Sequence, residues 1–361
     1  MPMLVKHLTQ LLQIIACLAA QMQLFMMKST GIYGDFIELL KLLPHGLISF
    51  GLFVKYNFQM SYKILNDNEI KFELFAPDAQ NVDFVLFSNG KQTESKMTKK
   101  GRVFEHTSNM AKVGDKYYFK INKSLNVPDP FSKYQPFDVH GATEIFESKF
   151  DWEDDVNWKG LPWKDAVIYE LHVATFSPSG TFQGVVEKLD YLKNLGITAI
   201  ELMPIADFSG IRNWGYDGVL LFAPDSIYGN PDDLRELVKQ AHKRGLQVFL
   251  DVVYNHFGPE GNYLSVYAKS EFFDDKKSTP WGDAINYNST FVRNFYVQNA
   301  VYWLEEFHMD GLRFDAVHSV IDSTSPHLIK EIAQKVQEKF CQKRHIHLML
   351  ENDDNDSDFR I

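Results

Sequence analysis

The sequence predicts an α/β protein in which a β-sandwich domain precedes a parallel sheet built from βα units. Two observations carry this prediction. Short segments with period-two alternation of apolar and polar residues follow residue 60, and alternating strand and helix patterns follow residue 166. Parallel strands joined by helices require right-handed crossovers, so the second part is either an open doubly wound sheet or a (β/α)8 barrel. A length of 361 residues suits about two domains.

The composition indicates a globular protein with large apolar cores and argues against nucleic acid as a partner. Hydrophobic residues make up 45% and aromatic residues 14% of the chain, while the net charge is −10. A negative protein without a long basic run does not suit the phosphate backbone. The two cysteines, Cys17 and Cys341, cannot form a disulfide framework, which fits a reducing compartment. We therefore expect a cytoplasmic protein with neither a nucleic-acid nor a membrane partner.

Residues 1–59 form an N-terminal extension of uncertain status. The segment 8–27 is apolar, but polar residues interrupt it too often for a membrane span. The interruptions are Thr9, Gln10, Gln13, Gln21 and Gln23. A short apolar run that ends at Cys17 leaves an exported protein as an alternative. We interpret the extension as sequence upstream of the first domain, for example from a start codon assigned too early.

The first domain is expected at residues 60–125 as a β-sandwich. Glu69–Leu74 and Asn81–Phe84 alternate with period two, as half-buried strands do. A third strand is expected within Asp115–Ile121, and short strands at this spacing are typical of sandwiches. Residues 126–165 then have the composition of an irregular linker, rich in proline, aspartate and aromatic residues.

Residues 166–361 are predicted to contain five βα units of a partial barrel. Asn230-Pro231 has the pattern of a helix N-cap followed by proline, and Gly196 and Gly245 have that of helix ends. The expected strands are 166–176, 197–205, 246–255, 311–317 and 347–350. No G-x-G-x-x-G or Walker motif follows the first strand, which weakens the case for a nucleotide-binding sheet. Polar residues gather at the carboxyl ends of the strands, where a barrel places its active site, and this favours the barrel.

Three of these strands end in residues suited to catalysis. Asp315 and Glu351 follow neighbouring parallel strands, so their carboxylates can meet at the mouth of one pocket. A pair about 5–5.5 Å apart serves retaining glycosidases as nucleophile and acid/base. Arg313 lies on the same strand face as Asp315 and is expected to keep it ionised, although a structural ion pair is the alternative. Glu351 has no cation beside it in the sequence, so we expect its pKa to rise.

The other polar residues at the strand ends have simpler explanations. Asp251 suits a supporting hydrogen-bond role better than catalysis, and His256 or His318 taken alone could be a core or loop histidine. His345-x-His347 lacks the accompanying carboxylates or cysteines of a zinc site. We therefore expect neither a metal nor another cofactor.

The segment Trp214-Gly215-Tyr216-Asp217-Gly218 indicates an aromatic platform. Its polar and glycine-rich surroundings favour exposed rings, which suit stacking on a sugar face. Trp281 belongs to the same aromatic set, which we expect to be partly core and partly sugar platform.

Three segments resemble, in order and spacing, the first three signature regions of the α-amylase superfamily, glycoside hydrolase family 13. They are Asp251–His256, Gly311–His318 and Leu350–Asp353. The resemblance covers residues 62–361 and implies a (β/α)8 TIM barrel behind an immunoglobulin-like N-terminal domain. Finer motifs, such as Asn213–Val219 and Glu351–Asn355, resemble the members that act on malto-oligosyltrehalose. In these members the reaction cuts the α-1,4 bond beside the terminal trehalose with retention and releases trehalose.

The resemblance also implies roles for the matching residues. Asp315 would be the nucleophile and Glu351 the general acid/base, with Arg313 positioning Asp315. The residues implied in substrate binding are Arg313, His318, His256, Tyr216, Trp214, Asn255 and Asp251.

One departure from the superfamily bears on activity. The third carboxylate of the superfamily belongs to an Asn-His-Asp motif, which does not occur in this sequence. We therefore expect the chain by itself to be inactive or poorly folded, and turnover of malto-oligosyltrehalose by residues 60–361 would overturn this. Two rivals to the hydrolase stay open: a glycogen debranching or branching activity, and a glucan-binding protein without catalysis.

Overall fold

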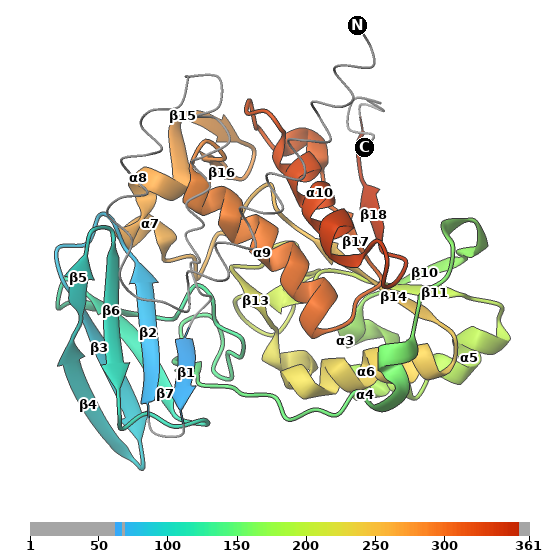
Figure 1. The fold of residues 1–361 in the computed structure, drawn as a ribbon, viewed down its shortest axis with the longest axis horizontal. Helices are drawn as coiled ribbons and strands as arrows, with labels where there is room; N and C mark the ends of the chain where they lie inside the picture. Colours follow the sequence, from blue (N-terminus) through green and yellow to red (C-terminus); the bar gives the residue numbers. More distant parts are fainter. Residues whose placement is uncertain (1–61, 67–68, 354–361) are drawn as a thin grey trace, which may run out of the picture. The chain divides into compact units, whose positions relative to one another are not determined.

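The computed structural model describes residues 62–66 and 69–353, so the predicted extension 1–59 lies outside the described residues (Figure 1). Among the residues described, no helix combines the length and the apolar character needed to cross a membrane. Strands come first in the chain, and the strand–helix alternation begins after residue 165. This order is the one that the hydrophobic patterns predict.

The N-terminal strands form two antiparallel sheets that share an aromatic core. One sheet has the order β1 (Tyr62–Asn66), β2 (Glu69–Phe75), β6 (Val103–Ser108), β5 (Thr98–Lys100). The other has the order β4 (Lys91–Lys96), β3 (Val82–Ser88), β7 (Lys116–Ile121), β8 (Leu125–Val127), with β9 (Thr143–Glu144) also on β7. Phe72 of the first sheet lies 4.2 Å from Phe84 and 4.9 Å from Tyr117 of the second, measured between ring centroids. The alternating pattern of β7 thus buries one face between the sheets.

The predicted linker, residues 126–165, is more ordered than its composition indicates. Its first part contributes β8 and β9 to the sandwich, so strands continue to Glu144. Its second part holds two short 3-10 helices, η2 (Glu153–Asn157) and η3 (Trp163–Asp165). The ring of Trp158 donates to Asp310 Oδ1 at 2.7 Å and fastens this segment to the foot of the parallel sheet.

Five parallel strands follow one another across the second sheet in the order of the chain. They are β10 (Ile168–Leu171), β11 (Ala199–Leu202), β14 (Gln247–Val252), β17 (Gly311–Phe314) and β18 (His347–Leu350). A doubly wound sheet reverses its strand order at a switch point, whereas consecutive barrel strands do not. The strand order therefore confirms the α/β class and argues for barrel strands over an open doubly wound sheet.

The strands are shorter than predicted. The first was expected to reach Phe176, but it ends at Leu171 and the chain turns into a short helix. The fourth was expected to reach Val317, but it ends at Phe314. In both places apolar residues continue past the last ladder hydrogen bond, so the hydrophobic pattern alone overestimates the strand.

Helices cover the connections between the strands, as the 3.6-residue pattern predicts (Figure 1). They are α3 (Val173–Phe176), α4 (Phe182–Val186), α5 (Leu189–Asn194), α6 (Pro231–Lys243), α7 (Leu264–Tyr267), α8 (Lys269–Phe272), α9 (Thr290–Glu306) and α10 (Leu328–Phe340). Asn230 caps α6 by accepting from the backbone of Asp232 and Asp233, and Pro231 occupies the first turn.

Short elements in the loops complete the second domain. The connection after β11 contains a hairpin of two strands and a 3-10 helix. They are β12 (Ala206–Asp207), β13 (Leu220–Pro224) and η4 (Ser226–Tyr228). The connection between β14 and α9 holds α7 and α8 and a second hairpin, β15 (Phe273–Thr279) with β16 (Gly282–Ile285). A last 3-10 turn, η5 (Val317–Ser319), follows β17.

Candidate active site

The carboxyl ends of β14, β17 and β18 bring three acidic residues together around one arginine. Asp251 and Arg313 are direct partners in the β14–β17 register. Beyond the strands, the backbone amide of Asp315 still donates to Val252 O, and that of Glu351 donates to Phe314 O, both at 3.1 Å. Parallel pairing thus sets Asp315 and Glu351 side by side, as their spacing of one βα unit predicts.

Arg313 is the centre of this group. Its Nη1 lies 2.5 Å from Asp251 Oδ2 and 3.0 Å from Asp315 Oδ1, and its Nη2 lies 3.3 Å from Glu351 Oε2. The expected pair with Asp315 is therefore present. Glu351 has no cation beside it in the sequence, but the fold brings Arg313 to it, because the guanidinium fork spans both strand ends.

Burial, and not the pair with Arg313, has the largest influence on the pKa of Asp315. Burial raises the pKa of Asp315, and the charge of Glu351 adds to this, while Arg313 opposes it. Burial likewise raises the pKa of Asp251 to about 7, although Arg313 and a hydrogen bond from Tyr216 oppose the shift. Arg313 therefore limits the rise in the pKa of Asp315 but does not bring it below its ordinary value, because desolvation outweighs the pairing.

A strained turn ties Asp315 to Glu351. Ala316 has a φ of +43°, in the left-handed region that residues other than glycine rarely adopt. In this conformation its amide donates to Glu351 Oε2 at 2.7 Å, and the amide of Val317 donates to Glu351 O at 3.0 Å. The turn thus fixes the direction of both candidate catalytic side chains.

Asn255 and His256 form a second ring of contacts around Asp315. Asn255 Nδ2 lies 3.4 Å from Asp315 Oδ2 and from the Asp315 carbonyl oxygen. His256 Nδ1 lies 2.6 Å from Asn255 Oδ1, and its Nε2 lies 3.0 Å from the carbonyl oxygen of Tyr216. Burial lowers the pKa of His256, which favours the neutral ring.

Tyr216 connects the loop after β11 to the same group. Its hydroxyl donates to Asp251 Oδ2 at 3.0 Å, the oxygen that also faces Arg313. Asp251 is only 1% exposed, so it can hold Tyr216 and Arg313 in place but offers no surface to a sugar. This geometry agrees with the supporting role expected for Asp251.

Three other residues that the sequence analysis singled out make no hydrogen bond or ion pair to Arg313 and its three carboxyl groups among the described residues. Trp214 is 74% exposed, as the glycine-rich pattern predicts, and lies outside the hydrogen-bonded cluster of the described residues. His318 is half-buried in η5, and within residues 62–353 its Nδ1 has no hydrogen-bond partner. Trp281, at the tip of the β15–β16 hairpin, stacks on His256 with ring centroids 4.6 Å apart. Sequence patterns gave no sign of this stacking, because the residues are 25 positions apart across an irregular loop.

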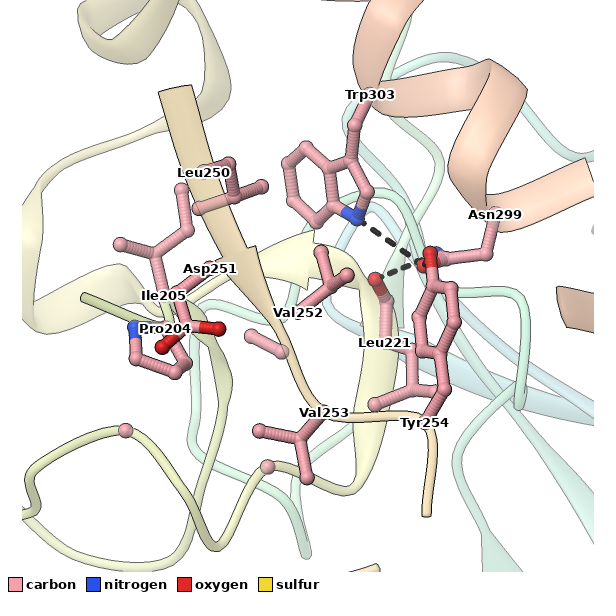
Figure 2. Close-up of a pocket in the computed structure, with 13 residues that line it drawn as sticks. Pro204, Ile205, Leu221, Leu250, Asp251, Val252, Val253, Tyr254, Asn299 and Trp303 are labelled. Carbon is pink, nitrogen blue, oxygen red and sulfur yellow. Dashed lines mark hydrogen bonds between the residues drawn. The ribbon is translucent and has the colours of Figure 1, made fainter. Parts of the chain in front are cut away.

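A small cavity lies beneath the site, between β14 and α9 (Figure 2). Its volume is about 20 Å³, enough for one water molecule and too small for a sugar ring. Asn299 organises its wall: it accepts from Tyr254 Oη at 2.6 Å and Trp303 Nε1 at 3.1 Å, and donates to Leu221 O at 2.7 Å. The cavity belongs to the packing that supports β14.

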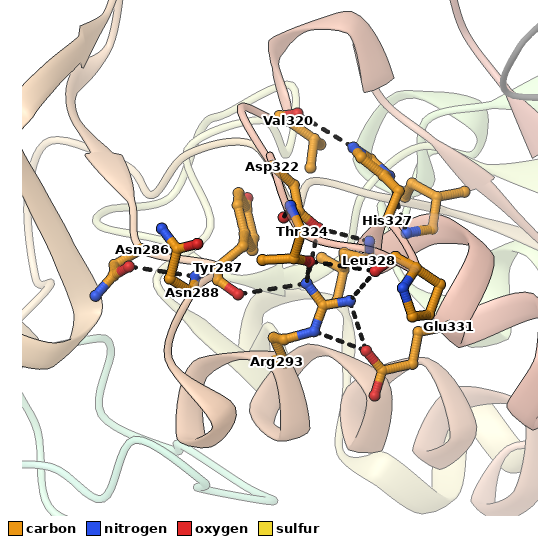
Figure 3. A network of polar contacts seen from close by, with 12 residues as sticks. Asn286, Tyr287, Asn288, Arg293, Val320, Asp322, Thr324, His327, Leu328 and Glu331 are labelled. Atoms are coloured by element: carbon orange, nitrogen blue, oxygen red, sulfur yellow. Dashed lines mark hydrogen bonds and ion pairs between the residues drawn. The ribbon is translucent and has the colours of Figure 1, made fainter. Parts of the chain in front are cut away.

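Arg293 on α9 anchors the far end of the segment that follows Asp315 (Figure 3). Its guanidinium lies 2.7 Å from Asp322 Oδ2 and 2.6 Å from Glu331 Oε2, and it donates to Pro326 O at 2.7 Å. Asp322 also accepts from the backbone amide of Leu328, at the start of α10. The segment 316–328 is therefore held at Glu351 by one end and at Arg293 by the other. Sequence patterns did not single out Arg293, which reads as an ordinary residue of a helix.

Comparison with known proteins agrees with this fold. Residues 144–283 match the family described as alpha amylase, catalytic domain, and residues 55–132 match carbohydrate-binding module 48, the isoamylase N-terminal domain. The chain is therefore similar to the α-amylase superfamily over both of these segments. A structure titled putative alpha amylase from Salmonella typhimurium is 42% identical, with a TM-score of 0.77, over 81% of this chain and 50% of that one.

Within the superfamily, the chain is similar to malto-oligosyltrehalose trehalohydrolases. It is 46% identical to the one from Saccharolobus solfataricus over 75% of this chain and 48% of that protein. It is 44% identical to the one from Deinococcus radiodurans, over 74% and 44% respectively. The chain thus spans about half the length of these curated relatives. A pullulanase from Paenibacillus barengoltzii, at 24% identity and a TM-score of 0.69, shares the fold.

Proposed function

We propose that this site belongs to a retaining glycosidase that cuts the α-1,4 bond next to the terminal trehalose of malto-oligosyltrehalose. The arrangement of Asp315 and Glu351 around Arg313 supports the proposal most directly. The charge of Glu351 contributes to the raised pKa of Asp315, so the two neighbouring carboxyl groups interact directly. A retaining glycosidase uses one ionised carboxyl as nucleophile and one protonated carboxyl as acid/base.

The resemblance assigns the two roles. Asp315 attacks the anomeric carbon and forms a glycosyl-enzyme ester, while Glu351 gives its proton to the departing oxygen. Glu351 then takes a proton from water as that water cleaves the ester, so the configuration is retained. Arg313, Asn255 and Asp251 hold these carboxyl groups in place, and His256, Tyr216, Trp214 and His318 are the proposed sugar contacts.

The substrate follows from the relatives. The curated proteins that the chain matches at 40–46% identity are named malto-oligosyltrehalose trehalohydrolases. This name supports trehalose as the product and a role of the protein in trehalose biosynthesis. We also infer a cytoplasmic location, since the chain carries only two cysteines and no disulfide framework.

The test measures trehalose release and sugar binding by the 361-residue chain. The chain is incubated with malto-oligosyltrehalose or with glycogen, and the products are separated. Trehalose released from the first substrate, with a loss of about 10³-fold or more in Asp315→Asn and unchanged affinity for maltoheptaose, would support the proposal and overturn the expectation that the chain by itself is inactive. Asp165→Asn, which changes an exposed carboxyl outside the site, is the matched control.

Two other outcomes would replace the proposal. Shortened or branched products from glycogen would show a debranching or branching enzyme. Equal sugar affinity of the chain and of Asp315→Asn, with turnover by neither, would show a glucan-binding protein.

A further inference from the structure

Asp207 lies at the base of the hairpin whose connecting segment carries Tyr216. The hairpin pairs β12 with β13, and the segment 208–219 runs between them. Backbone hydrogen bonds close its base, from Val219 N to Asp207 O at 2.9 Å and from Asp225 N to Ile205 O at 2.8 Å. A change in the charge of Asp207 therefore affects the base of the segment 208–219.

The side chain of Asp207 is buried without a partner. Its exposed fraction is 0%, and neither carboxyl oxygen has a hydrogen-bond partner among the described residues. Asp225 beside it is 2% exposed, but its oxygens accept from the amides of Ile227 at 2.9 Å and Phe208 at 3.2 Å. An ionised carboxylate with no donor and no cation costs a large desolvation free energy, which a proton removes.

Among the residues that the structure describes, no positively charged group is found to act on Asp207. The charged groups that act on it are Asp225 and Asp138, both negative. The hydroxyl of Tyr228, buried against Asp225, also has no hydrogen-bond partner in residues 62–353. His140 lies beyond them, paired with Glu260 on the exposed side.

A metal ion does not fit this place either. In the part of the chain that the structure describes, no group of three His, Cys, Asp or Glu side chains could hold a metal. A proton is therefore what neutralises the Asp207 side chain. Burial and the charge of Asp225 raise the pKa of Asp207 well above its ordinary value, and burial raises that of Asp225 to about 7.

We propose that Asp207 is a positioning residue whose bound proton keeps the segment 208–219 closed and Tyr216 in contact with Asp251. The segment reaches the site through the Tyr216 hydroxyl, 3.0 Å from Asp251 Oδ2, and through the Tyr216 carbonyl, 3.0 Å from His256 Nε2. Loss of the proton places an unpartnered charge at the foot of the segment and opens it. Only the consequence for sugar binding rests on the proposed function.

The sign of the pH effect follows from the direction of the shift. The closed segment binds the proton more tightly than the open one, so closure is strongest below the ordinary pKa of about 4. As pH rises from there toward the raised pKa of the closed form, the opening equilibrium grows about tenfold per pH unit.

The experiment measures amide hydrogen exchange in the intact chain at about pH 6 and about pH 9, corrected for intrinsic exchange. The reporters are the amides of Val219 and Asp225, and amides within α6 serve as an internal reference. We expect protection of the reporters to fall at least about tenfold more than that of α6 in the wild type. Asp207→Asn, which keeps the shape without the titration, should reduce this difference to the part that Asp225 contributes, and Asp165→Asn should retain it in full.

Each outcome decides the inference. Reporter protection in the wild type that is independent of pH overturns it without any variant, even if Asp207→Asn fails to fold. A pH response in Asp207→Asn equal to that of the wild type also overturns it. Calorimetry with maltoheptaose then separates the two proposals: no binding at any pH counts against the proposed function, whereas a pH-dependent affinity ratio between wild type and Asp207→Asn supports both.

Discussion

Arg313 shows how one residue can set the charge of a whole site. It faces three carboxyl groups, so a single positive charge is shared among Asp251, Asp315 and Glu351. One cation cannot offset three neighbouring carboxylates, and burial of Asp251 and Asp315 therefore raises the pKa of both. The pKa of Asp315 is raised despite the contact with Arg313 for this reason.

Replacing Arg313 with glutamine should raise the pKa of Asp315 further. The guanidinium is the main opposing influence on that pKa, and an opposite charge at this distance shifts a carboxyl by about one to three pH units. The titration of the Asp315 side-chain carboxyl by carbon-13 NMR measures the change, and Asp315→Asn assigns the signal. Arg244→Gln, which removes the exposed partner of Asp190, is the control and should leave the titration unchanged.

At this scale the sequence predicts pairs along a strand better than contacts across loops. The Arg313–Asp315 pair follows from the two-residue period of a strand, and the nearness of Glu351 follows from one βα unit. The contact of Tyr216 with Asp251 has no such rule, because a glycine-rich loop can adopt many paths. The raised pKa of Asp315 was missed because burial has no signature in a short motif.

The segment between β17 and α10 is fixed by an ion-pair network on the helices. Arg293 is 12% exposed at its side chain and Asp322 only 1%, so their pair lies away from water. Hydrogen bonds from Thr324 and Leu328, besides Arg293, overcome burial and lower the pKa of Asp322. Through Asp322, the network connects Arg293 of α9 to Leu328 at the start of α10 (Figure 3). It thereby fixes the end of the segment that begins at Ala316.

Changing Arg293 to methionine should destabilise the protein by about 3–5 kcal/mol, because it leaves the buried charge of Asp322 without its cation. Lys335→Met, which breaks an exposed pair with Glu338, should cost less than about 1 kcal/mol. Urea unfolding of the two variants gives the difference. Equal costs for both would show that the network contributes no more than a surface ion pair.

Elements were predictable to the extent that their pattern is local. The five strands, the capped helix at Asn230 and the sandwich strands follow from periodicity and capping residues. The ends of the strands could not be predicted from the pattern, because β10 ends at Leu171 and β17 at Phe314 while apolar residues continue beyond them. The β12–β13 and β15–β16 hairpins were also missed, because both lie in connections where turn residues mask short strands.

Across the whole molecule, buried ionisable groups favour an acidic pH for maximal stability. Burial raises the pKa of Asp207, Asp225 and Asp251, so these groups stabilise the fold below about pH 4 and lose that contribution as pH rises toward 7 and above. Burial lowers the pKa of His242, but Asp310 and Asp155 raise it by more. The stability that His242 contributes is therefore lost above about pH 6.5. Against its own burial, Asp155 has a pKa lowered by hydrogen bonds with His242, and its contribution is lost in strong acid.

These opposing directions predict a free energy of unfolding that peaks at about pH 4–5 and declines toward pH 8. Each raised carboxyl contributes a slope of about 1.4 kcal/mol per pH unit within its own window, so the decline exceeds that of a single proton. Urea unfolding at about pH 5 and about pH 8 measures it. The combined variant Asp207→Asn, Asp225→Asn and Asp251→Asn should flatten the decline, whereas Asp165→Asn should not. Stability that rises over this range would mean that the three buried carboxyls are ionised in the folded protein, and that their neutral forms do not hold the loop and the site in place.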